Sequence, residues 1–404
     1  MLTIGLAHRL LRSGPGYLES KPMTVAADAP ARRRSHPVFL HTGWRSRGTW
    51  IWAALRSEPA ALSFYEPLHE GLATLTPESI AVGRPDFWTS GHSNMAPYWK
   101  EYAGLLRPGV PGVPGYRTEF ATENAFAGAD QDLPGLAAYL RGLLGYATAL
   151  DRVAVLKFCR SLGRVAWLRA NFPEALHVVV LRRPDAQWAS ARRQVEVHRN
   201  PFFLTMPLLT LARNAEAPIV ARVCRALHVP LPRLRQPDPE RTAEVCRRLV
   251  DMLSWADRHR VFLAYWMAGA ISALATDSLV LDSDMLLWSA QYRDEIATIL
   301  RRSGLEFDLT IEPAHTAAAV PALGGEEAET QRTALGLLQE HRAALRPEGY
   351  LLAWNMIAAG LLRPDGTMQH TEAAEREDLT APLSPPRPLF RNPWARREGA
   401  AATR

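Results

Sequence analysis

A segment between residues 43 and 50 combines glycine, arginine and hydroxyl side chains in the manner of an anion-binding loop. It reads Gly-Trp-Arg-Ser-Arg-Gly-Thr-Trp and lies between a short apolar run and a helical pattern. Free backbone N–H groups and the positive end of a helix dipole meet at such a place, where phosphate and sulfate bind. Arg45 would add charge, and Ser46 and Thr49 would add hydroxyl donors. A basic turn with a helix cap is the competing interpretation.

A second candidate element follows the apolar run His177–Leu181. Arg182 comes at the end of this run, and Ser190 follows eight residues later in a helical pattern over residues 185–197. In parallel α/β proteins, ligands bind outside the carboxyl ends of the strands. Arg182 and Ser190 could therefore hold one phosphate from two sides, although a surface arginine and a helix serine would explain the pair equally well.

Together the two segments resemble the nucleotide-binding elements of the sulfotransferases that use 3′-phosphoadenosine 5′-phosphosulfate (PAPS). In that family a loop P-[KR]-[ST]-G-[ST]-[ST]-W holds the 5′-phosphosulfate, and a later R-[DN]-P-x(5)-S holds the 3′-phosphate. Aligned without gaps, the first loop is matched by Arg45, Ser46, Thr49 and Trp50. The second element is matched by Arg182, Pro184 and Ser190.

The departures of this chain from the family pattern include positions 47, 48 and 183. Arg47 occupies the usual glycine, Gly48 stands where a hydroxyl residue is common, and Arg183 replaces Asp or Asn. A shift of the alignment would make Arg47 the main sulfonate-contacting cation, but the gapless match favours Arg45. The resemblance implies that PAPS contacts Arg45, Ser46, Arg47, Gly48, Thr49, Trp50, Arg182 and Ser190.

Two further segments are similar to carbohydrate-type members of the family. Residues 64–68 (FYEPL) are close to their "YEP" segment, and residues 156–160 (LKFCR) are like their strand with K-x-x-R. The resemblance covers residues 36–305 in patches. The spacing between the two nucleotide elements suits carbohydrate-type and bacterial members.

The resemblance implies transfer of a sulfonate group from PAPS to a hydroxyl or amine of a small acceptor, with no metal. The "YEP" segment favours a carbohydrate or glycolipid. Glu66 is the first candidate for the general base, His69 and Glu70 are the next, and His92 is more distant. Arg45 would neutralise charge on the leaving group, so the expected catalytic residues are Arg45, Glu66 and His69.

Two alternatives remain at this point. A P-loop-type nucleotide kinase or NTPase also contains a strand–loop–helix element. Its Walker A pattern, however, has a lysine immediately before the hydroxyl residue, whereas here Gly48 stands immediately before Thr49. A non-catalytic polyanion-binding protein would use the same arginines without chemistry. Asp282 and Asp284 are interpreted as a helix cap or a structural ion pair.

Four apolar runs are predicted strands that would position these residues. They are Pro37–Thr42, Val153–Phe158, His177–Leu181 and Ser278–Leu281, and a helical pattern follows each one. This alternation predicts an α/β fold with a mainly parallel central sheet. The resemblance makes it a three-layer αβα fold similar to that of the P-loop NTPases. Residues 71–135 are predicted to be irregular and residues 203–275 helical.

Composition shifts divide the chain into four parts. We expect a disordered leader over residues 1–35, with Met1 or Met23 as the start, and the α/β domain over residues 36–311. A helical C-terminal extension over 312–380 and a disordered Pro/Arg-rich tail over 381–404 would follow.

The overall composition is that of a globular protein: 404 residues, 47% hydrophobic and 22% charged. The net charge of +6 is dispersed among acidic residues, so we expect no nucleic-acid partner. Cys159, Cys224 and Cys246 have no disulfide or metal spacing and suit a reducing compartment. The longest apolar run, Val261–Ala275, is shorter than the ~20 residues that span a bilayer. We predict a cytoplasmic protein without an integral membrane segment; the oligomeric state is open.

Overall fold

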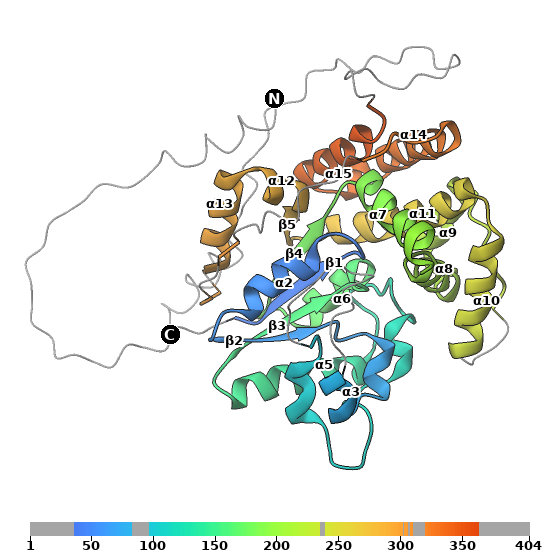
Figure 1. Ribbon diagram of the computed structural model, residues 1–404. Coiled ribbons are helices and arrows are strands. Elements are labelled where there is room, and N and C mark those ends of the chain that lie inside the picture. The colour runs from blue at the N-terminus through green and yellow to red at the C-terminus, as the bar shows by residue number, and fades with distance from the viewer. Residues whose placement is uncertain are drawn as a thin grey trace, which may run out of the picture. The chain divides into compact units, whose positions relative to one another are not determined.

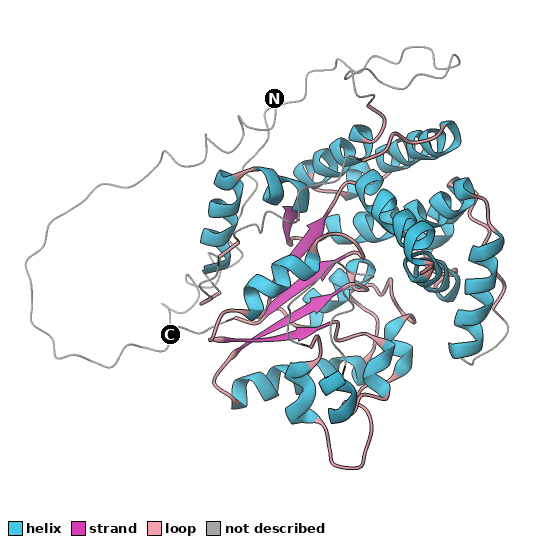
Figure 2. Ribbon diagram, viewed as in Figure 1, coloured by secondary structure: helices cyan, strands magenta, loops and turns pink. Residues whose placement is uncertain are grey.

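Five parallel strands form the central sheet (Figure 1; Figure 2). The structure, a computed structural model, describes residues 36–82, 97–234, 239–301, 303–305, 308–309 and 320–362. The strands are β1 (Val38–Thr42), β2 (Ala61–Tyr65), β3 (Val153–Phe158), β4 (Leu176–Leu181) and β5 (Leu279–Asp282). Their order in the sheet is β2-β3-β1-β4-β5. The predicted α/β fold with a mainly parallel sheet is confirmed, and every strand pair is parallel.

Helices cover both faces of the sheet because successive strand residues point to opposite sides. On one face, Val38 and Leu40 pack in one cluster with Ile51 and Trp52 of α2 (Gly48–Arg56). The same cluster includes residues of α12 (Ser283–Trp288) and α13 (Ala290–Arg301). On the other face, Phe39 packs in a cluster with residues of α5 (Pro134–Ala149) and α6 (Val165–Asn171).

A largely helical region follows β4. Its helices are α7 (Pro184–His198), α8 (Phe202–Arg213), α9 (Pro218–Ala226), α10 (Pro239–Met252) and α11 (Trp255–Leu274). These confirm the predicted helical region over residues 203–275. Between β2 and α5 the described chain forms α3 (Pro77–Val82) and the short 3₁₀ helices η1 (Glu70–Ala73), η2 (Lys100–Leu105) and η3 (Thr118–Ala121).

The C-terminal region is helical, with α14 (Gly325–Glu340) and α15 (Pro347–Ala359). Both helices share one buried cluster with α7, α8 and α11. Trp188 Nε1 of α7 donates to Glu327 Oε1 of α14 (3.1 Å), which ties the two segments together. The described part of the extension predicted from residue 312 therefore completes the core of the α/β region. The predicted leader and tail lie outside the described residues.

The strand predictions were accurate within one residue, with one omission. β3 was predicted with its observed bounds, β1 and β4 each differ by one residue at one end, and β5 differs by one residue at both ends. β2 was missed because its sequence, ALSFY, follows a helix after only a short turn and shows no clean alternation. It becomes a strand by pairing with β3, from Ala61 opposite Val153 to Tyr65 opposite Lys157.

The chain leaves β1 and β4 in opposite directions. From β1 it passes through α2 to β2 on one side of the sheet, and from β4 it continues to β5 on the other side. Crevices for ligands form at such a switch point, beyond the carboxyl ends of the strands. The segments that follow β1 and β4 are residues 43–47 and 182–183, which are the two predicted nucleotide-binding elements.

The described residues include no helix with both the length and the apolar character required to cross a bilayer. The three cysteines are all buried and unpaired.

Buried histidines make the core sensitive to acid. Ser161 Oγ lies 2.8 Å from His41 Nδ1, and His41 Nε2 lies 3.0 Å from His177 Nδ1. His177 Nε2 lies 3.0 Å from the carbonyl of Phe172, which can only accept, so each ring nitrogen of the two histidines is fixed as a donor or an acceptor.

His259 in α11 is fully buried and packs against Trp188 with ring centroids 5.1 Å apart. Burial, together with the charge of Arg260, lowers the pKa of His259 to about 3.

We expect the protein to lose stability as the pH falls below about 6.5 because of His259. The unfolded chain then binds a proton that the folded chain excludes, which costs roughly 2 kcal/mol at pH 5. His259→Phe should make the dependence of the free energy of unfolding on pH shallower between pH 7 and 4. Urea titrations at several pH values measure this, with His198→Gln at the half-exposed end of α7 as the control. An unchanged slope in His259→Phe would contradict the assignment.

Candidate functional site

The loop after β1 has an unusual backbone. Arg45 (φ 63°) and Arg47 (φ 64°) both adopt the left-handed conformation, which costs a non-glycine residue on the order of 1 kcal/mol. Gly48 is required for a different reason. A Cβ atom there would lie 2.5 Å from Thr42 Cγ2, so no hydroxyl residue fits at this position of the loop. The departure of Gly48 from the family pattern follows from this close approach to β1.

The backbone N–H groups of this loop are free. Among the described residues, none accepts a hydrogen bond from the N–H groups of Arg45 through Thr49. Trp50 N is the first to bond, to the carbonyl of Arg47 (3.0 Å). A run of unpaired N–H groups at the beginning of a helix is a binding site for an anion.

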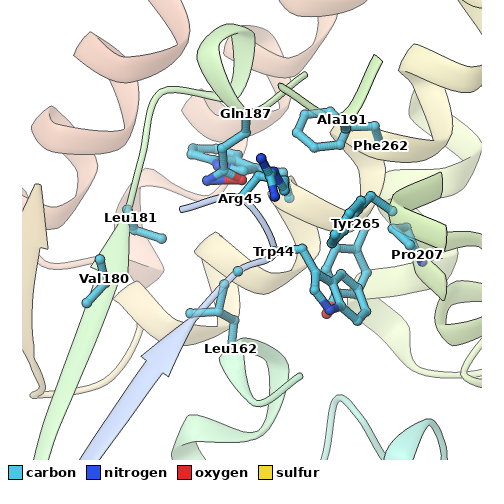
Figure 3. Close-up of a pocket in the computed structure, with 13 residues that line it drawn as sticks. Trp44, Arg45, Leu162, Val180, Leu181, Gln187, Ala191, Pro207, Phe262 and Tyr265 are labelled. Atoms are coloured by element: carbon cyan, nitrogen blue, oxygen red, sulfur yellow. The ribbon is translucent and has the colours of Figure 1, made fainter. Parts of the chain in front are cut away.

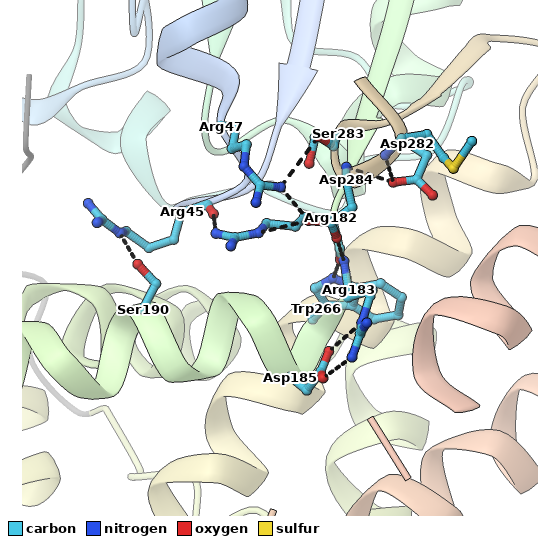
Figure 4. Close-up of polar contacts among 11 residues, drawn as sticks. Arg45, Arg47, Arg182, Arg183, Asp185, Ser190, Trp266, Asp282, Ser283 and Asp284 are labelled. Carbon is cyan, nitrogen blue, oxygen red and sulfur yellow. Dashed lines mark hydrogen bonds and ion pairs between the residues drawn. The ribbon is translucent and has the colours of Figure 1, made fainter. Parts of the chain in front are cut away.

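The side chain of Arg45 extends from the loop toward α7 (Figure 4). Its Nε donates to Ser190 Oγ (2.8 Å), and its guanidinium lies 5.2 Å from the ring centre of Phe203. Within the part of the chain that the structure describes, no carboxylate forms an ion pair with Arg45. Burial therefore lowers the pKa of Arg45, although nearby tyrosines and Cys159 act in the opposite direction. A half-buried cation without a counter-ion favours the binding of an anion.

Arg182 joins the two predicted elements. Its Nη1 donates to the carbonyl of Arg45 (2.8 Å), and its own carbonyl accepts from Trp266 Nε1 (3.1 Å). Burial and the charge of Arg47 lower the pKa of Arg182 to about 10, while Asp284 opposes the shift. The structure thus brings Arg45, Arg182 and Ser190 together, as the sequence predicted.

Arg47 points the other way, toward the beginning of α12 (Figure 4). Its Nη1 forms a short ion pair with Asp284 and also approaches the carbonyl of Ser283 (3.4 Å). The positive charge of Arg47 is therefore already balanced by a carboxylate, whereas that of Arg45 is not. This difference favours Arg45 as the cation that contacts an anionic ligand.

The remaining loop residues have distinct surroundings. Ser46 is buried, and its hydroxyl donates to the carbonyl of Gly43 (2.7 Å), which holds the loop closed. Thr49 Oγ1 lies 3.1 Å from the hydroxyl of Tyr65, at the end of β2. Trp50 is half-buried and packs at the edge of the cluster beneath α2.

Glu66 lies just beyond β2 in a buried ion pair. Lys157 Nζ donates to Glu66 Oε1 (3.1 Å) and to Cys159 Sγ (2.8 Å). Burial alone would raise the pKa of Glu66, but the charges of Lys157 and Arg160 outweigh it and the pKa is lowered. Cys159 also lies 3.4 Å from Thr42 Oγ1, so this network reaches the end of β1, where the loop over residues 43–47 begins. Burial raises the pKa of the Cys159 thiol to about 11.

The two other predicted base candidates serve as anchors. His69 Nδ1 accepts from Gly71 N (3.0 Å) and caps η1, so the neutral ring carries its proton on Nε2. Glu70 pairs with the buried guanidinium of Arg160, and despite its own burial its pKa falls to about 2. His92 lies outside the described residues.

The ion pair of Asp284 confirms its interpretation as a structural ion pair, but sequence reasoning identified neither Arg47 as its partner nor Glu66 as the partner of Lys157. Asp284 pairs with Arg47 and lies 3.6 Å from Arg182 Nε. Asp282 accepts from Asp284 N (2.8 Å) and Met285 N (3.2 Å), which confirms its interpretation as a helix cap. The available signal for Asp284 was its place just beyond a predicted strand.

The described residues line two cavities, of which the first contacts the loop after β1. The first, about 20 Å³, holds about one water molecule and is far smaller than a ligand pocket. It lies beside Arg45 between aromatic side chains of α8 and α11 (Figure 3). The second is a polar cleft of about 510 Å³ between residues 123–131 and the junction of α8 with α9. Its walls include Glu123, Asn124, Gln131, Arg213, Asn214 and Glu216.

No group of three His, Cys, Asp or Glu side chains in the described ranges could hold a metal ion.

No family model, curated protein or solved structure matches the chain. Function is therefore inferred from the arrangement of its own residues.

Glu66→Gln should destabilise the protein, because it leaves the buried ammonium of Lys157 without a counter-ion. We expect the free energy of unfolding to fall by about 3 kcal/mol. In the double variant Glu66→Gln/Lys157→Met the loss should be smaller than the sum of the two single losses. Denaturant titration measures all three, and Glu196→Gln, which breaks an exposed pair with Arg192, should cost less than about 0.5 kcal/mol. Additive losses would show that the pair is not coupled.

Proposed function

We propose that this protein is a PAPS-dependent sulfotransferase with a three-layer αβα fold similar to that of the P-loop NTPases. The proposal rests mainly on one observation. The two predicted anion-binding elements, the loop after β1 and the segment after β4, lie in contact with each other. The free N–H groups of residues 45–49 lie beside Arg45, which has no counter-ion among the described residues and contacts Ser190. A ligand with anionic groups at two separate positions suits this arrangement, and PAPS is such a ligand.

Each end of the nucleotide would have its own partners. The 5′-phosphosulfate would lie on the loop N–H groups with Arg45 and Thr49, and the 3′-phosphate would contact Ser190 and Arg182. The Arg45–Ser190 hydrogen bond spans the space between these positions. Binding would replace it with hydrogen bonds from both side chains to the nucleotide.

The reaction would be an in-line transfer. The bond between sulfur and the bridging phosphate oxygen breaks, a bond from the acceptor oxygen to sulfur forms, and 3′-phosphoadenosine 5′-phosphate leaves. Arg45 stays protonated throughout and would stabilise the charge that grows on the leaving phosphate. The loop N–H groups, fixed before the reaction, would stabilise the remaining oxygens.

Glu66 is the preferred group to take the proton from the acceptor. Lys157 keeps Glu66 ionised, so that it can accept a hydrogen bond from a hydroxyl or amine. His69 is a weaker candidate, because its Nδ1 already accepts from Gly71 N. Glu66 would take this proton as the bond from the acceptor oxygen to sulfur forms, because the acceptor is then acidic enough to protonate a carboxylate of lowered pKa.

The acceptor would be a small hydroxylated molecule, such as a sugar or glycolipid, because residues 64–68 resemble the "YEP" segment of the carbohydrate-type sulfotransferases. The buried, unpaired cysteines suit a cytoplasmic enzyme.

Nucleotide binding tests the proposal directly. We expect 3′-phosphoadenosine 5′-phosphate to stabilise the protein by about 2.7 kcal/mol at a hundredfold excess over its Kd. ADP should stabilise it much less, with or without magnesium, because it lacks the 3′-phosphate. Thermal unfolding with each ligand measures this. Stabilisation only by ADP with magnesium would point to a kinase or NTPase, and equal responses would point to polyanion binding; either result overturns the proposal.

Arg45→Ala and Ser190→Ala should each weaken binding of 3′-phosphoadenosine 5′-phosphate. Loss of a charged hydrogen bond predicts a Kd raised by roughly tenfold to a hundredfold for Arg45→Ala, and by about tenfold for Ser190→Ala. Isothermal titration calorimetry measures both. Arg192→Ala is the matched control, since Arg192 lies two residues beyond Ser190 on α7 and pairs with Glu196. Wild-type affinity in Arg45→Ala would exclude Arg45 from the site.

A further inference from the structure

We infer that Asp284 is the positioning residue that holds both nucleotide-binding elements in register. This inference rests on the proposed function for its ligand, but its structural part can be tested without any ligand. Asp284 belongs to α12, more than 230 residues beyond the loop that it contacts. It would touch neither the substrate nor the reacting atoms.

Both carboxylate oxygens of Asp284 are in use (Figure 4). Oδ1 accepts from Arg47 Nη1 and lies 3.6 Å from Arg182 Nε. Oδ2 accepts from the backbone N–H of Arg183 (3.2 Å). One side chain therefore links the loop after β1 to the segment after β4.

The position of Asp284 is itself well defined. Asp282 at the end of β5 caps α12 by accepting from Asp284 N and Met285 N. The backbone N–H of Asp282 donates to the hydroxyl of Tyr292 on α13 (3.1 Å). Since β5 pairs with β4 from Val178 opposite Leu279 onward, the beginning of α12 is held in fixed relation to Arg182.

The ion pair explains how an arginine can stand at the left-handed position 47. Glycine would adopt this backbone without a steric penalty. Arg47 incurs that penalty, and its bond to Asp284 offsets it by fixing the side chain on the far side of the crevice. The Arg47–Asp284 ion pair therefore permits a backbone conformation at position 47 that glycine would adopt without a partner.

Asp284 also balances charge beside the nucleotide site. Arg47 and Arg182 are both largely buried, and among the described residues Asp284 is the only carboxylate in ion-pair distance of either one. Without it, the two guanidinium groups would repel each other. Arg182 would then lose the orientation in which it donates to the carbonyl of Arg45.

A double-mutant cycle tests the inference. Asp284→Asn should raise the Kd of 3′-phosphoadenosine 5′-phosphate by roughly tenfold. In an Arg47→Gly background the same substitution should have a smaller effect, about threefold, because glycine needs no tether. Asp277→Asn is the matched control: Asp277 lies just before the opposite end of β5 and pairs with Arg346. It should leave the Kd unchanged.

Tryptic cleavage after Arg45 and Arg47 gives a readout that needs no nucleotide. Cleavage should be faster in Asp284→Asn than in the wild type and in Asp277→Asn. If the wild type fails to bind 3′-phosphoadenosine 5′-phosphate, the proposed function fails, but the cleavage rates still test the tether. The inference is overturned if Asp284→Asn lowers only the melting temperature, with wild-type Kd and wild-type cleavage. Strictly additive effects of Asp284→Asn and Arg47→Gly on the Kd would also overturn it.

Discussion

An excess of unpaired positive charge at the carboxyl edge of the sheet is the constraint on which the candidate site depends. Arg45 has no carboxylate partner among the described residues, and the N–H groups beside it have no acceptor. Burying such groups costs free energy unless an anion pairs with the charge and accepts hydrogen bonds from the N–H groups. The nearby cations Arg47 and Lys157, by contrast, are each paired with a carboxylate. The excess positive charge is thus carried by Arg45 and by Arg182, which shares Asp284 with Arg47.

The topology of the sheet explains why this position lies between β1 and β4. These neighbouring strands send the chain in opposite directions, and crevices form beyond the carboxyl ends of parallel strands at such a place. The loop after β1 and the segment after β4 face each other there, and Arg182 connects them through the carbonyl of Arg45. The helices that follow β4 close the crevice from one side and contribute Ser190.

Much of this arrangement could be predicted from the sequence, because strands with buried faces and loops rich in glycine and arginine have local signatures. The parallel sheet follows from such signals, and the family resemblance implied that Arg45 and Ser190 contact one nucleotide. The edge strand β2 could not be predicted, since only pairing with β3 makes it a strand. Nor could the partners of Arg47 and Glu66, because they come from distant strand ends and their choice depends on three-dimensional register. The close approach of Gly48 to Thr42 is likewise visible only in the folded chain.

The long separation between Arg47 and Asp284 has a consequence for the growing polypeptide on the ribosome. The loop after β1 is synthesised long before residue 284, so the counter-ion of Arg47 is added only after β5 has been made. Domains tend to fold from the N-terminus as they emerge. Until residue 284 is available, the nascent chain carries this basic loop without its tether. The crevice therefore reaches its final form late in translation, after all five strands exist.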